Sequence, residues 1–160
     1  MVRRKRLIVS YPKGKTWFLL MKDKHIQAFM KTAWVFSECS TAKRLKVGCV
    51  AVKNDRILSI GYNGTPVGWP SNRCENEAGE TLPEVLHAES NMLMKLCASH
   101  ESSEGATLFC THSPCLGCAK LILQAKIKTV YYDQEYRSRE GLDFLQKSGV
   151  EIIRVNKIVV

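Results

Sequence analysis

The chain has 160 residues, of which 45% are hydrophobic and 24% charged, the composition of a soluble globular protein and the length of one domain. No run approaches the roughly 18 consecutive apolar residues of a membrane-spanning helix, so no such helix is expected. The net charge is +9, but residues 1–24 carry eight Lys or Arg against one acid, Asp23, so about +2 remains on the rest of the chain.

The basic start of the chain is predicted to be an arm, residues 1–23, that precedes a single domain, residues 24–160. Only three apolar residues follow Arg3–Arg6 before Tyr11, too few for the apolar core of a signal peptide, so we expect a cytoplasmic protein. The arm could contact RNA, DNA or a protein partner, but a solvated tail or a covering strand is the expectation that the charge pattern favours.

The first half of the domain is predicted to be a helix, a hairpin and a loop. Apolar residues recur at helical spacing over residues 24–39. Two β-branched-rich runs follow at 47–52 and 57–60, and the Asn54–Asp55 turn between them predicts a β-hairpin. Residues 61–80 are dense in Gly, Pro and Asn, which is typical of a loop.

The second half alternates between helix and strand. A helix is expected from residue 83 to about 98, because apolar residues recur at helical spacing and Pro83 and Glu84 suit a first turn. The later segments are a strand at 106–111, a helix at 113–125, a strand at 127–132, a helix at 140–147 and a strand at 151–155. This order predicts an α/β sandwich with a mixed sheet.

Two short motifs combine metal ligands with the start of a predicted helix. They are His-Ala-Glu at 87–89 and Pro-Cys-Leu-Gly-Cys at 114–118. The seven cysteines, an odd number, argue against a disulfide framework and for metal binding. Cys115 and Cys118 share one helix face, where free N–H groups stabilise thiolates. With His87 they give zinc three ligands and leave a tetrahedral position for water, the pattern of a catalytic site.

Glu89 follows the ligand His87 by two residues. Bound zinc lowers the pKa of water to about 7, and Glu89 would accept a proton from that water and pass it to a leaving amine without binding the metal. The combination H-x-E with P-C-x-x-C is the signature of zinc nucleobase deaminases. The alternative, a structural zinc site, lacks a fourth ligand, because His112 and Cys110 lie on or beside a predicted strand.

On these motifs, residues 24–155 resemble the deoxycytidylate (dCMP) deaminases of the cytidine deaminase-like superfamily. The Gly-Tyr-Asn-Gly segment at 61–64 narrows the resemblance from the superfamily to this group. The other matching segments are Val-Gly at 47–48, His-Ala-Glu-Ser-Asn at 87–91, Thr-His-Ser-Pro-Cys at 111–115, Cys-Ala-Lys at 118–120, Val-Tyr-Tyr at 130–132 and Tyr-Arg at 136–137. The resemblance implies a three-layer α/β/α fold with a mixed central sheet of about five strands.

The resemblance also implies a reaction, the hydrolysis of dCMP to dUMP and ammonia, which supplies dUMP for thymidylate synthesis. It implies that Asn63 contacts the sugar, Arg44 binds the phosphate, and Tyr136, followed by Arg137, helps close the pocket. Ser113 precedes a predicted helix start whose N–H groups could bind the base or the phosphate. From the residues alone, an Asn in a Gly-flanked turn more often serves the backbone geometry of the turn than a ligand, and Arg44 could be a solvated charge.

Regulation is implied by the resemblance alone. Family members are typically hexamers that dCTP activates and dTTP inhibits, with Mg²⁺ accompanying the triphosphates, and Tyr62, Asn63 and Gly64 match the effector-binding segment. Nucleic acid and membranes are not expected partners. Several relatives hold a second, structural zinc in the loop before the catalytic His; here that loop, from Cys74 to Leu86, offers only Cys74, so we expect one zinc.

Two alternatives stay open at this point. The enzyme could deaminate another cytosine or adenine substrate, such as dCTP, cytidine or a tRNA adenosine, and the basic arm gives the tRNA version a little support. Arg44 and the Gly-Tyr-Asn-Gly segment favour a mononucleotide, because a polymer needs no phosphate clamp of this kind. The protein could also be a silent nucleotide-binding zinc protein, against which the intact Glu89 argues.

Overall fold

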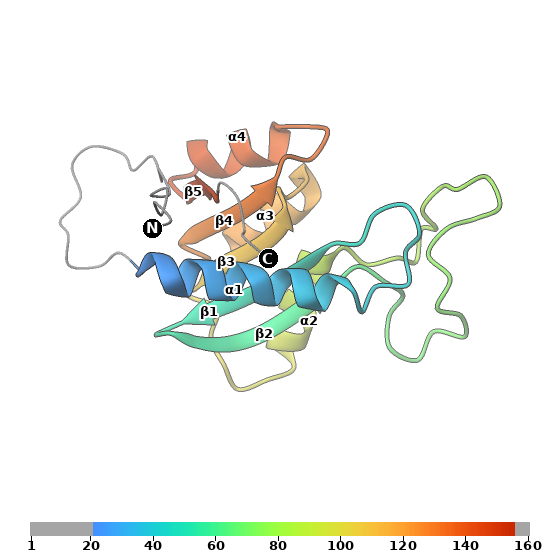
Figure 1. Cartoon of the computed structure of the whole chain (residues 1–160), viewed down its shortest axis with the longest axis horizontal. Helices are drawn as coiled ribbons and strands as arrows, with labels where there is room; N and C mark the ends of the chain where they lie inside the picture. Colours follow the sequence, from blue (N-terminus) through green and yellow to red (C-terminus); the bar gives the residue numbers. More distant parts are fainter. Residues whose placement is uncertain (1–20, 156–160) are drawn as a thin grey trace, which may run out of the picture.

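The computed structural model describes residues 21–155, so residues 156–160 of the predicted domain and nearly all of the predicted arm (1–20 of 1–23) lie outside the described residues (Figure 1). The elements are, in order, α1 (Asp23–Ser37), β1 (Gly48–Lys53), β2 (Arg56–Tyr62), α2 (Ala88–Cys97), β3 (Thr107–His112), α3 (Leu116–Gln124), β4 (Thr129–Gln134), α4 (Glu140–Lys147) and β5 (Glu151–Arg154). Among residues 21–155, every helix is too short or too polar to cross a bilayer.

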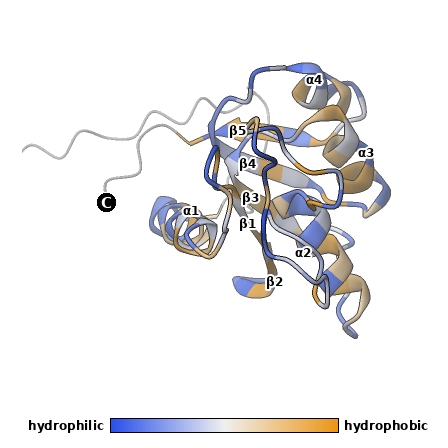
Figure 2. Ribbon diagram, turned by 90° about the vertical axis from the view of Figure 1, so that its right-hand side faces the viewer, coloured by the Kyte–Doolittle hydropathy of each residue, from blue (hydrophilic) through white to orange (hydrophobic). Residues whose placement is uncertain are grey.

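The five strands form one mixed sheet in the order β2-β1-β3-β4-β5. Strand β1 pairs antiparallel with β2 and with β3, whereas β3, β4 and β5 run parallel. Helix α1 covers one face of the sheet, and α2, α3 and α4 cover the other (Figure 2). The α/β/α layers and the mixed sheet of about five strands that the sequence predicts are therefore confirmed.

Each face of the sheet has its own hydrophobic core, because side chains alternate along a strand. In β1, Cys49 and Ala51 pack toward α2, α3 and α4, whereas Val50 and Val52 pack toward α1. All four side chains are buried. The continuous apolar run that marks this strand in the sequence thus reflects burial on both faces.

The predicted hairpin is confirmed, and its turn explains the residues found there. Asn54 and Asp55 have φ angles of 53° and 58°, the left-handed conformation that both central residues of a type I′ turn need. Asn and Asp adopt this conformation more readily than most residues. Strands β1 and β2 are thereby paired from Gly48 opposite Tyr62 to Lys53 opposite Arg56, with a shift in register between Ala51 and Val52.

The predicted start of the second helix at residue 83 is wrong. Helix α2 begins only at Ala88, because Leu86 is paired with Gly64 in an antiparallel bridge, N–H to carbonyl at 2.9 and 3.1 Å. Backbone groups held in this way are not available to a helix. His87 therefore becomes the residue that precedes the helix, in an extended conformation, and Glu89 lies in the first turn.

Candidate metal centre and adjoining pocket

The His87, Cys115 and Cys118 side chains meet where α2 and α3 begin. Nδ1 of His87 lies 3.5 Å from Sγ of Cys115 and 3.4 Å from Sγ of Cys118. The three ligand atoms all lie within 4.8 Å of one another, and they form the one such group among residues 21–155. Two helix starts on neighbouring elements thus bring together residues that are 28 and 31 positions apart.

This geometry fits zinc. With bonds of about 2.0–2.1 Å to nitrogen and 2.3 Å to sulfur, tetrahedral zinc requires an N···S separation of about 3.5 Å between two ligands. The two measured separations agree with that value. Three protein ligands also match the catalytic type of zinc site, which keeps one coordination position for water or substrate. His87, Cys115 and Cys118 therefore form the zinc site that the sequence predicts.

The surroundings of the Cys115 side chain favour its thiolate form. Its pKa is lowered to about 3, chiefly because Cys118 and then His87 stabilise the thiolate by hydrogen bonds. Cys115 also caps α3, since its sulfur accepts the N–H of Cys118 at 3.5 Å. The pKa of His87 is raised mainly by its hydrogen bond to Cys115. Thiolates are the form of cysteine that binds metal, so these hydrogen bonds favour the ligand state of Cys115.

Glu89 lies beside the metal ligands and is buried, at 4% exposure. Burial is the main cause that raises the pKa of its carboxyl group, while the nearby His87 lowers it. A carboxyl group with a raised pKa exchanges protons more readily near neutral pH than an exposed one. Because Glu89 is not one of the three ligands, it is free to serve as the proton carrier that the sequence predicts.

A pocket of about 500 Å³ opens next to the metal ligands, within the range of small-molecule sites. His87, Glu89 and Cys115 are part of its wall. All four predicted substrate-binding residues, Arg44, Asn63, Ser113 and Tyr136, are also part of it. The remaining lining residues are Ala42, Leu45, Val47, Cys74, Glu75, Thr81, Val85, Ala88, His112 and Arg137.

Arg44 belongs to the loop between α1 and β1 and is exposed, with Nη1 donating to the carbonyl of Gly79 at 3.3 Å. The loop around it is held by Glu75, a carboxylate with only 8% exposure. Oε1 of Glu75 accepts the backbone N–H of Lys43 at 3.1 Å and of Arg44 at 3.2 Å. Glu75 therefore fixes the backbone that presents the Arg44 guanidinium to the pocket.

The Asn63 amide holds the other end of the same loop. Its Oδ1 accepts the N–H of Val47 and its Nδ2 donates to the carbonyl of Leu45, both at 2.8 Å. One Nδ2 hydrogen remains for a ligand in the pocket that Asn63 lines. The structural and the ligand-binding interpretations of this residue are therefore compatible.

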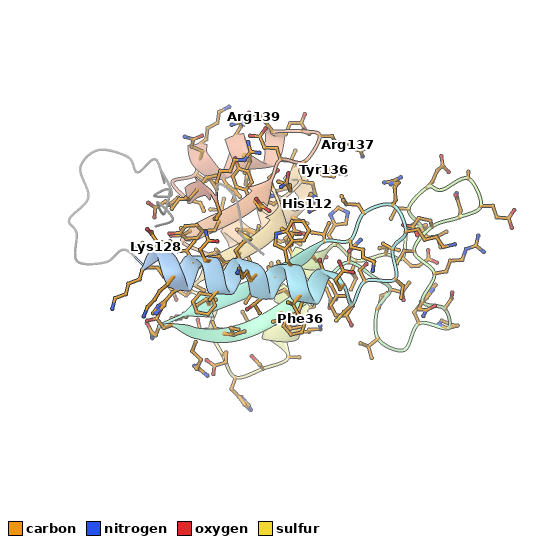
Figure 3. The ribbon with its side chains drawn as sticks, viewed as in Figure 1. Phe36, His112, Lys128, Tyr136, Arg137 and Arg139 are labelled. Carbon is orange, nitrogen blue, oxygen red and sulfur yellow. The ribbon has the colours of Figure 1, made fainter. Side chains whose placement is uncertain are left out.

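Ser113 and Tyr136 join the ends of β3 and β4. The backbone N–H of Tyr136 donates to Oγ of Ser113 at 2.8 Å, and the N–H of Ser113 donates to the carbonyl of Gln134, also at 2.8 Å. The Arg137 guanidinium lies 5.4 Å from the centre of the Tyr136 ring. Tyr136, Arg137 and His112 lie near one another at the carboxyl ends of these strands (Figure 3).

The predicted effector residues separate into two environments. Asn63 lines the pocket, whereas Tyr62 and Gly64 are not among its lining residues in the described chain. The Tyr62 ring faces the ammonium group of Lys95, 5.0 Å from the ring centre, and its carbonyl accepts from Nδ2 of Asn91. Gly64 contributes the bridge to Leu86 that places His87.

Glu75 and His112 are the pocket residues whose roles the sequence did not predict. Glu75 is 31 residues from Arg44, and no local spacing signals that the two are in contact. The sequence offers His112 only as a candidate fourth zinc ligand, yet it lies outside the ligand group and lines the pocket. Its one signal was its position directly before Ser113 in the matching segment at 111–115.

Comparison with known proteins agrees with this site. The family model for the cytidine and deoxycytidylate deaminase zinc-binding region matches residues 23–134. A crystal structure of dCMP deaminase from the cyanophage S-TIM5, in complex with dCMP and dUMP, superposes with a TM-score of 0.84 at 53% identity, covering 85% of this chain and all of that one.

Curated relatives give the same result at lower identity. Deoxycytidylate deaminase of Enterobacteria phage T2 is 31% identical over 173 residues, covering 81% of this chain and 91% of its own. Deoxycytidylate deaminase of Saccharomyces cerevisiae is 34% identical over 151 residues, covering 88% of this chain but 47% of its own.

Proposed function

The chain belongs to the cytidine and deoxycytidylate deaminase zinc-binding family, and we propose that it hydrolyses dCMP to dUMP and ammonia. The observation that carries the proposal is one pocket whose wall includes two of the zinc ligands, His87 and Cys115, together with Glu89 and the two arginines Arg44 and Arg137. The metal end is suited to replacing an amine by water, and guanidinium groups are suited to binding a phosphate. A mononucleotide whose base carries an exocyclic amine fits both the metal end and the guanidinium groups of the pocket.

The chain's own residues divide the reaction between them. His87, Cys115 and Cys118 would hold the zinc, which when bound would supply a Lewis acid to activate the water consumed in the hydrolysis. Glu89 takes a proton from this water and delivers it to the leaving nitrogen, so that ammonia departs and oxygen replaces it on the ring. The buried position of Glu89 keeps its carboxyl away from bulk water while it carries the proton.

The rest of the pocket binds and orients the nucleotide in this proposal. Asn63 donates its remaining amide hydrogen to the sugar, and Arg44 pairs with the 5′-phosphate. Tyr136 and Ser113 close the wall beside the base, where the hydrogen bond between them keeps the ends of β3 and β4 together. In this arrangement the ring carbon that reacts lies next to the metal ligands, and the charged phosphate lies next to Arg44.

Release of ammonia from a panel of substrates tests the function. The panel is dCMP, dCTP, cytidine and an RNA hairpin, each with and without added dCTP or dTTP. We expect turnover of dCMP at a rate well above that of the other three. If dCMP is untouched while another member is deaminated, the proposed substrate is wrong and the zinc deaminase assignment stands.

Regulation belongs to the same proposal. We infer that dCTP activates and dTTP inhibits, each with Mg²⁺, through Tyr62, Asn63 and Gly64, in a hexamer located in the cytoplasm. The identities and signs of the effectors, the Mg²⁺ and the hexamer come from the family resemblance. The place of the segment is supported by Asn63, which lines the pocket, and the cytoplasmic location by the seven cysteines, all within residues 21–155, none of which forms a disulfide. The effector arms of the substrate panel and sedimentation of the protein test these points.

A further inference from the structure

The His112 ring is held in place from two sides. Nδ1 lies 3.1 Å from Oγ1 of Thr111, and the Trp34 ring meets it edge to face with 5.8 Å between centres. Trp34 is itself fixed, because Nε1 donates to Oδ2 of the buried Asp133 at 3.1 Å. A side chain restrained in this way is oriented before any ligand arrives.

The hydrogen bonds of Thr111 define which nitrogen of His112 carries the proton. Thr111 is fully buried, and its hydroxyl oxygen accepts the backbone N–H of Gly48 at 3.1 Å. The hydroxyl hydrogen needs an acceptor, and Nδ1 of His112 is the other polar atom in contact with it among residues 21–155. Nδ1 is therefore the acceptor, and a neutral ring carries its hydrogen on Nε2.

The Nε2–H group of His112 is available to a ligand in the pocket. The side chain lines the pocket together with Ser113, Tyr136 and Arg137, and Nε2 is on the side of the ring away from Thr111. Burial lowers the pKa of His112, so the ring is neutral near pH 7. The relay from Gly48 through Thr111 thus presents one fixed N–H donor to the pocket.

We propose that His112 is a substrate-binding residue whose Nε2–H donates to the 5′-phosphate of the nucleotide. This inference rests on the proposed function. A phosphate oxygen is the acceptor that the surroundings favour, because Arg137 lies on the same wall and Arg44 lines the same pocket. Among residues 21–155, the pocket has two acidic residues. Glu75 is hydrogen-bonded to the backbone of the Arg44 loop, and Glu89 lies beside the metal ligands. An N–H of fixed direction on Nε2 would add a directional hydrogen bond to the charge of the two guanidinium groups.

Two substitutions separate the pocket donor from the support given by Thr111. His112→Asn keeps an oxygen near the position of Nδ1 for the Thr111 hydroxyl but has no N–H at the position of Nε2. His112→Gln has an N–H near the position of Nε2 but no acceptor for Thr111. His100→Asn, at an exposed loop position, is the matched control.

We expect His112→Asn to weaken the binding of nucleotides that carry a 5′-phosphate and to leave the binding of the nucleoside nearly unchanged. A hydrogen bond to a charged group contributes about 1.5–3 kcal/mol, so His112→Asn should lower kcat/KM for dCMP about ten- to a hundredfold and weaken inhibition by dUMP equally. Inhibition by deoxyuridine, which has no phosphate, should change by less than about twofold. His112→Gln should lower kcat/KM for dCMP clearly less than His112→Asn does. The zinc content should stay at one per chain in both variants.

Three results would overturn the proposal. One is an Asn variant with unchanged dCMP turnover and dUMP inhibition in an active enzyme. Another is equal weakening of dUMP and deoxyuridine, which would assign His112 to the sugar or base. The third is a Gln variant as impaired as the Asn variant, which would assign it a structural role. A parent enzyme inactive on dCMP would instead defeat the proposed function itself.

A measurement without turnover tests the tautomer. In ¹⁵N-labelled protein the coupling pattern of the His112 ring should show the hydrogen on Nε2, and addition of dUMP should shift the Nε2 signal more than the Nδ1 signal. A hydrogen on Nδ1 would contradict the relay through Thr111 and with it the proposal.

Discussion

Gly141 lies directly against Pro114: a Cβ atom on residue 141 would stand 2.1 Å from the Pro114 carbonyl oxygen and 2.8 Å from the carbonyl carbon of Cys115. The first turn of α4 is therefore packed on the backbone that carries one of the zinc ligands. Separations this short leave no room for a side chain. The position of Cys115 depends in this way on a residue 26 positions later that has no chemistry of its own.

Gly141→Ala should therefore weaken the metal centre. The added methyl group must push α4 away from the Cys115 backbone, and overpacking of this kind costs about 1–3 kcal/mol. We expect a lower Tm and faster loss of zinc to a chelator. The control is Gly117→Ala, where the new Cβ would lie 3.8 Å from Sγ of Cys115, an ordinary contact, and where Ala favours the helix. Equal behaviour of the two variants would contradict the argument.

Removal of a ligand should abolish metal binding. Cys115→Ala leaves zinc with His87 and Cys118, and two ligands hold it far more weakly than three. We expect the purified variant to contain little zinc by atomic absorption and to lack activity. Cys97→Ala, which removes an exposed cysteine of α2, should keep both. An active, zinc-loaded Cys115→Ala protein would mean that the ligand set is wrong.

Glu89→Gln should separate metal binding from proton transfer. The amide has nearly the same shape but does not carry a proton between water and the leaving nitrogen, so turnover should fall about 10²- to 10⁴-fold. Zinc should remain stoichiometric, because Glu89 is not a ligand. A variant that retains a rate within about tenfold of the parent would remove Glu89 from this role.

The parts of this molecule that the sequence predicts are those with short-range signals. The apolar run of β1, the Asn54–Asp55 turn and the Cys115–Cys118 spacing each depend on residues within a few positions of one another. The zinc ligands and Glu89 could be identified because their spacing is itself the chemical requirement.

The features that the sequence did not predict depend on pairs that are distant along the chain. The start of α2 follows from the bridge between Gly64 and Leu86, and Pro83 gave a plausible but misplaced helix signal. The tautomer of His112 depends on Gly48, 63 residues before Thr111. Such contacts leave no periodic pattern of residues in the sequence, because they are made only after the sheet has assembled.

Glu75 supplies a test of how the Arg44 loop is held. Its Oε1 accepts the N–H groups of Lys43 and Arg44, so Glu75→Ala leaves both donors without this acceptor and frees the loop. A mobile loop binds phosphate less well, and we expect KM for dCMP to rise about tenfold while kcat and zinc content change little. Glu77→Ala, two residues further and exposed, is the control.

The conservative variant makes this prediction specific. Glu75→Gln keeps an acceptor oxygen for the two N–H groups and removes a negative charge from the pocket wall. Its KM for dCMP should therefore be at or below that of the parent, because the dianionic phosphate no longer faces a carboxylate. If Gln raises KM as much as Ala does, the charge of Glu75 and not its hydrogen bonding determines substrate binding.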